Sequence, residues 1–266
     1  MSPDSLATVL RQGSFSAALP GIFVHFLALT LIAAAVLLLN RTANATTDSR
    51  FLRHIAAAFA IMFFFRLGLI VVACSKALLA FQYLGYNLQA SLEPAQAAKA
   101  EQTLGDVNST WTAISLILSY LSTFWFLLAW WLLRSYPKQG IPRGFYVSAI
   151  GILSALVGLS AGIVNVANAN AFKLLSIVDV LSSAGVIVMV GWELRKLAPK
   201  RGHPALAGVV FILYACWGLL QLPMLAFKID TDTTYYMVLM VSGFAAMLVT
   251  VLHSSLVLED KPEFKA

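Results

Sequence analysis

Long apolar runs separated by short polar segments dominate the pattern of residues along this chain. Seven runs are long enough for an α-helix to cross the hydrocarbon core of a bilayer, which takes about 20 residues. These runs cover residues 21–39, 55–81, 111–133, 145–166, 174–194, 205–227 and 235–258. The pattern predicts an all-α integral membrane protein whose seven transmembrane helices form one bundle.

The composition points the same way. Hydrophobic residues make up 60% of the 266 positions and charged residues only 11%. A soluble globular protein carries roughly 25% charged and 45–50% apolar residues, so a water-soluble fold would expose too much apolar surface. Seven spans account for about 140 residues. We therefore expect residues 1–266 to form a single membrane domain with no appended soluble domain.

Positive charge sets the predicted orientation. Most of the 18 Lys and Arg residues fall in three alternate loops and the C-terminal tail. They are Arg41, Arg50, Arg53, Arg134, Lys138, Arg143, Arg195, Lys196, Lys200, Arg201, Lys261 and Lys265. By the positive-inside rule these segments are cytoplasmic, and an odd number of spans then places the N-terminus outside.

This distribution accounts for the net charge of +6 without nucleic acid as a partner. The lipid bilayer is the partner that the apolar runs require. The basic loops are the predicted docking surface for a cytoplasmic partner. We expect a multi-pass protein of the plasma membrane or of a bacterial inner membrane.

One long loop, residues 86–110, joins the second and third runs. Pro94 suits the first turn of a helix, with Glu93 just before it, and Gly105 suits a helix end. The loop therefore predicts a short outer helix, and the alternative is a solvated extension of the second span.

Three charged residues lie well inside the apolar runs: Arg66, Lys76 and Asp179. Lys76 is near the predicted outer surface, where a lysine stem reaches the interface. At about 1.5 Å per residue, Arg66 and Asp179 lie roughly 18 and 24 Å from the cytoplasmic ends of their helices. Because an unpaired charge at this depth is costly, we hypothesise that the two form an ion pair. The pair would be either a ligand, ion or proton site, or a contact that fixes helix packing.

Hydroxyl side chains recur at helical spacing on two spans. The residues concerned are Ser176 and Ser183 beside Asp179 on the fifth span, and Thr112, Ser115, Ser119 and Ser122 on the third. Such stripes either line a polar cavity or form hydrogen bonds between packed helices.

Two further patterns concern packing. Gly151, Ala155, Gly158 and Gly162 form a small-residue stripe on the fourth span, which predicts close approach to a neighbour in the same chain or in a second copy. In the sixth span Pro223 predicts a kink and a candidate hinge, because proline removes a backbone hydrogen bond. Gln221, two residues earlier, is a candidate polar contact at that kink.

Motifs for catalysis or cofactor binding are missing from the sequence. It contains neither a zinc-protease helix, nor a nucleophile elbow, nor a nucleotide-binding glycine loop. Cys74 and Cys216 lie in apolar runs without metal-ligand spacing. The last run, 235–258, lacks the lysine that a retinal Schiff base needs. We expect no enzyme activity, no cofactor and no metal.

The leading functional hypothesis is a heptahelical sensor or receptor-like protein that acts through a partner, because the spans carry polar inner faces. A transporter or channel for a small solute or ion is the first alternative. An accessory or scaffold subunit of a membrane complex is the second.

Overall fold

The computed structural model describes residues 2–45, 50–136, 140–166 and 169–196, together with Phe211, Ile212, Ala215 and Leu219. Within these residues the chain is all-helical and contains no strand. Its six helices are α1 (Pro3–Gln12), α2 (Phe15–Ala45), α3 (Arg50–Leu84), α4 (Pro94–Arg134), α5 (Arg143–Val166) and α6 (Ala169–Lys196).

Five of these helices, α2 to α6, are long and apolar enough to cross a membrane. They coincide with the first five predicted spans and fit a multi-pass membrane protein in a lipid bilayer. The sixth and seventh predicted spans, with Gln221 and Pro223, lie outside the described residues apart from Phe211, Ile212, Ala215 and Leu219. The total of seven spans and the orientation of the chain therefore stay predictions.

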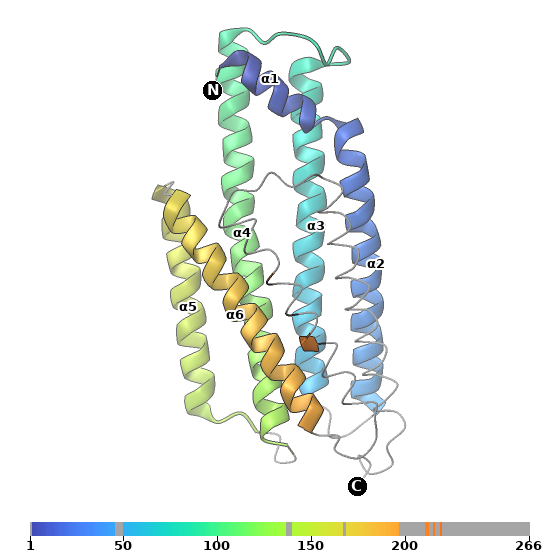
Figure 1. The fold of residues 1–266 in the computed structure, drawn as a ribbon, viewed down its shortest axis with the longest axis vertical. Coiled ribbons are helices and arrows are strands. Elements are labelled where there is room, and N and C mark those ends of the chain that lie inside the picture. Colours follow the sequence, from blue (N-terminus) through green and yellow to red (C-terminus); the bar gives the residue numbers. More distant parts are fainter. Residues whose placement is uncertain are drawn as a thin grey trace.

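The long helices run up and down beside one another (Figure 1). α2, α3 and α4 stand side by side, and α5 and α6 pack against the other side of α4. The largest apolar core joins α2, α3, α4 and α6 through large side chains such as Ile32, Phe59 and Phe126. Phe59 and Phe126 meet edge to face, with ring centroids 5.6 Å apart. This core lies mainly in the half of the bundle away from α1.

Helix α1 is a short amphipathic helix that lies across one end of the bundle (Figure 1). Its N-terminus is stabilised by an N-cap, because the Ser2 side chain accepts a hydrogen bond from the Ser5 amide at 3.3 Å. Pro3 occupies the first turn. Leu6 and Leu10 bury themselves against α3 and α4. The pattern of long apolar runs does not predict α1, because only one face of its ten residues is apolar.

Helix α4 extends the third span toward the α1 end. Pro94 is its first residue and Glu93 its N-cap, so the predicted start of the outer helix is confirmed. The predicted end at Gly105 is wrong, and so is the alternative of an extension of the second span. The helix continues through Gly105 into the apolar run because Leu104 is buried in the cluster that packs under α1. The second span ends separately at Leu84, before Gly85, whose φ of 57° is the left-handed conformation that glycine favours.

Helix α5 carries the small-residue stripe on an open face. Gly151, Ala155, Gly158 and Gly162 are all exposed, and a Cβ atom added to any of the three glycines would meet nothing within 4 Å. The described residues thus provide no close neighbour for the stripe within the chain. Contact with a second copy through this span stays a prediction.

Among the described glycines tested for an added Cβ atom, Gly68 is the one where the packing leaves no room for it. The Trp111 ring of α4 lies against the α3 backbone at this position, so an added Cβ atom would overlap the ring. Phe65, one turn earlier on α3, also contacts Trp111, with ring centroids 5.6 Å apart. The pair Gly68–Trp111 sets how closely α3 and α4 approach.

We expect Gly68→Ala to lower the free energy of unfolding by about 1–3 kcal/mol, the usual cost of overpacking. Gly151→Ala is the matched control, because its new methyl group would enter open space. The measurement is denaturant unfolding of both variants in the same detergent. Equal stability of the two variants would contradict the close contact between Trp111 and the α3 backbone.

Candidate functional site

The hydroxyl groups of the stripe on α4 interact with different helices. Ser122 is buried and donates a hydrogen bond of 3.2 Å to the Ala58 carbonyl of α3. Ser115 donates instead within its own helix, to the Thr112 carbonyl at 2.9 Å. Ser119 interacts with the carboxyl group of Asp179 on α6. The stripe thus joins α4 to α3 through Ser122 and to α6 through Ser119.

Asp179 is the centre of the most distinctive arrangement in the described part of the chain. Besides Ser119, its charge acts on the phenol group of Tyr120. Its Oδ1 atom is buried, and no described residue gives that atom a hydrogen bond. A carboxyl oxygen held away from water without a donor destabilises the fold, because the group loses its hydration.

Tyr120 connects three helices at this point. Its hydroxyl group donates a hydrogen bond of 3.2 Å to the Leu175 carbonyl of α6. It also interacts with the hydroxyl group of Ser160 on α5. Ser160 is fully buried, at 0% exposure, and donates to the Leu156 carbonyl at 2.8 Å. We call Ser119, Tyr120, Ser160 and Asp179 the Asp179 cluster.

Apolar side chains surround the cluster. Leu116 and Leu175 are buried with Tyr120, and Leu153 and Leu156 of α5 pack against them. Such an environment has a low dielectric constant, so a charge or a hydrogen-bond donor placed near Asp179 would interact with it more strongly than in water. The arrangement is suited to hold a small cation or a donor group.

Arg66 occupies a different place in the bundle. Its side chain is 7% exposed, and its guanidinium carbon lies 5.3 Å from the centre of the Phe65 ring. Its charge acts on His25 of α2. The contacts that the structure gives for Asp179 do not include Arg66, and the hypothesised ion pair between these two residues stays a prediction.

The remaining candidates on α6 are Ser183 and Ser176. The hydroxyl group of Ser183 donates to the Val180 carbonyl at 3.1 Å, within its own helix. Ser176, one turn before Asp179, lies on the same helix. Within the described residues, no group of three metal-ligating side chains comes together.

Tyr120 and Ser160 were not predicted from the sequence as members of a site. Tyr120 directly follows Ser119, but a tyrosine in an apolar run is usually part of a core. Ser160 is one of three serines in the fourth span, with Ser148 and Ser154, and the clearest pattern of that span is the stripe of small residues. A signal was present, because both are polar groups that need a partner inside the bilayer.

No protein-family model, curated protein or solved structure matches this chain. The geometry of the Asp179 cluster is therefore the basis for the functional argument.

Double-mutant cycles distinguish the two possible partners of Asp179. Residues in contact couple by about 0.5–3 kcal/mol, whereas separate sites add within about 0.5 kcal/mol. For stability we expect Ser119→Ala to couple with Asp179→Asn, and Arg66→Gln to be additive with it. The measurement is the free energy of unfolding of the singles and doubles. Coupling through Arg66 rather than Ser119 would support the ion-pair hypothesis and contradict Ser119 as the partner.

Proposed function

We propose that this chain is a membrane sensor, or receptor-like protein, that binds a small ligand at the Asp179 cluster and acts through a partner. The ligand carries a cationic or hydrogen-bond-donating group. The setting is the plasma membrane or a bacterial inner membrane.

One observation carries the proposal: the buried Oδ1 atom of Asp179, to which no described residue donates a hydrogen bond. Ionisable groups inside a membrane are costly, and a functional site such as a ligand or ion site is their default interpretation. A donor or a cation at this atom would offset the cost of burying it. Ligand binding would thus stabilise the folded state.

The packing of α5 supports a role for this helix in transmitting the signal. Ala149 and Ser160 are its buried residues among those described, whereas large side chains such as Val147, Ile152 and Leu159 are exposed. The inner surface of α5 meets the cluster through Ser160. A ligand that changes the contact between Tyr120 and Ser160 would shift a helix that few buried side chains hold in place.

The far end of α5 lies among basic residues. Arg134, Arg143, Arg195 and Lys196 stand at the ends of α4, α5 and α6, at the end of the bundle away from α1 (Figure 1). Trp131 connects α4 to this region in two ways. Its ring packs on the Phe145 ring, with centroids 4.2 Å apart, and its indole N–H donates a hydrogen bond of 3.1 Å to the Gly140 carbonyl. A displacement of α5 would therefore reposition the segment that we propose as the docking surface for a cytoplasmic partner.

The test is a thermal-shift screen of the purified protein across alkali cations, ammonium compounds and small hydrogen-bond donors. Wild type is compared with Asp179→Asn, and with Glu193→Gln as the matched control. Glu193 lies on the same helix but pairs with Lys196 at 3.1 Å near the helix end. A ligand at 100 times its Kd stabilises by about 2.7 kcal/mol, which gives a shift of several degrees.

We expect at least one compound to raise the Tm of wild type and Glu193→Gln but not of Asp179→Asn. An equal response of all three proteins would contradict a site at the cluster. Solute flux in liposomes that depends on Asp179 would contradict the sensor hypothesis and support the transporter hypothesis. If no compound shifts the Tm and a membrane protein copurifies with the chain, the scaffold-subunit hypothesis would be supported instead.

A further inference from the structure

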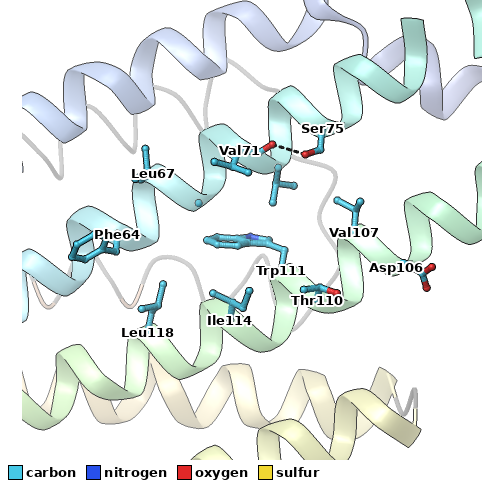
Figure 2. A pocket seen from close by; sticks show the side chains of 12 residues that line it. Phe64, Leu67, Val71, Ser75, Asp106, Val107, Thr110, Trp111, Ile114 and Leu118 are labelled. Atoms are coloured by element: carbon cyan, nitrogen blue, oxygen red, sulfur yellow. Dashed lines mark hydrogen bonds between the residues drawn. The ribbon is translucent and has the colours of Figure 1, made fainter. Parts of the chain in front are cut away.

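A cavity lies between α3 and α4, nearer the α1 end, and shares no lining residue with the Asp179 cluster. Its volume is about 590 Å³, within the usual range for small-molecule sites. Figure 2 shows Trp111 pointing from α4 toward α3 in the middle of this space. The ring packs against the backbone at Gly68 and forms part of the cavity lining.

The cavity opens sideways through the surface of the bundle. Phe64, Val71 and Ile114 line it and are 59%, 56% and 43% exposed. In a membrane these residues face lipid, so a molecule dissolved in the bilayer would enter without passing through water. The opening predicts a ligand with an apolar body.

Polarity is unevenly distributed along the cavity. Phe64 and Leu118 line one end, whereas Ser75, Asp106 and Thr110 line the end nearer α1 (Figure 2). At about 1.5 Å per residue, Phe64 lies about 21 Å along α3 from Arg50 and Ser75 about 38 Å. The apolar end thus falls within a hydrocarbon core of about 30 Å, and the polar end reaches the interface.

The charged and polar residues at the polar end of the cavity determine which headgroup of an amphiphile would bind there. Asp106 is exposed and is the charged residue of the lining. The Ser75 hydroxyl group already donates to the Val71 carbonyl at 2.9 Å, so toward an occupant of the cavity its oxygen can only accept a hydrogen bond. A carboxylate and a hydroxyl acceptor favour a cationic donor group over an anionic one.

We propose that this cavity binds a single-chain cationic amphiphile, a long-chain amine, from the leaflet at the α1 end. Its hydrocarbon chain lies along Trp111 between Phe64 and Leu118. Its ammonium group meets Asp106 at the interface. The proposal does not rest on the function of the Asp179 cluster.

The test uses the full chain in lipid nanodiscs and the quenching of Trp111 fluorescence. The probe is a long-chain primary amine with bromine atoms on its chain, compared with the carboxylate and the alcohol of the same chain. Trp111→Phe identifies which part of the quenching comes from Trp111. Val71→Phe and, independently, Ile114→Phe fill the cavity. Leu78→Phe is the matched control, since Leu78 lies on α3, is 69% exposed and does not line the cavity.

We expect saturable quenching of Trp111 by the amine, at least tenfold weaker in the two filling variants and unchanged in Leu78→Phe. Asp106→Asn should weaken amine binding roughly two- to fivefold, as for a partly exposed charge pair, and leave the alcohol unaffected. Saturable binding that is equal for all three headgroups would overturn the assignment of a cationic ligand. Quenching that rises linearly without saturation, and equally in the filling variants, would show ordinary lipid contact and overturn the site.

Discussion

Inside a bilayer no water is available, so every polar group of the chain must be satisfied by the protein itself. The backbone meets this constraint by forming the long helices α2 to α6. The side chains meet it by crossing between helices, as Ser122 does to the Ala58 carbonyl and Tyr120 to the Leu175 carbonyl. Helix α4 supplies both of these donors, and it contacts α1, α3, α5 and α6. The bundle is thus organised around one helix whose polar residues face different neighbours.

The two candidate sites differ in how they relate to this constraint. At the Asp179 cluster a buried carboxyl oxygen has no described donor. Between α3 and α4 the Trp111 ring on Gly68 leaves an apolar cavity open to the membrane, with polar groups only toward the α1 end. We propose a small polar ligand at the first site and an amphiphile at the second. They lie on opposite sides of α4, so an occupant of either would act on the same helix.

The apolar runs were sufficient to predict five helices that the structure describes, because the bilayer imposes both their length and their composition. The short helix α1 has no such signature, since it packs across the helix ends and needs only one apolar face.

Asp179 was recognised from the cost of burying it, but its partners were not. Depth along a helix was known from the sequence, whereas rotation about the helix axis was not. Among the described residues, Asp179 interacts with Ser119 and Tyr120, and the charge of Arg66 acts on His25. The contact between Ser160 and Tyr120 joins two helices. The spacing of residues within one helix cannot predict such a contact.

The central claim is that the Asp179 cluster admits a ligand rather than only fixing α5 in place. Cysteine accessibility in native membranes tests it most directly, with Ser160→Cys introduced after Cys74 and Cys216 have been replaced by alanine. The account predicts that a small cationic thiol reagent modifies position 160, that Asp179→Asn slows the reaction, and that a cysteine at the buried apolar Ala184 stays unmodified. A cysteine at position 160 that is as inert as one at 184 would contradict the account and leave the cluster with a packing role.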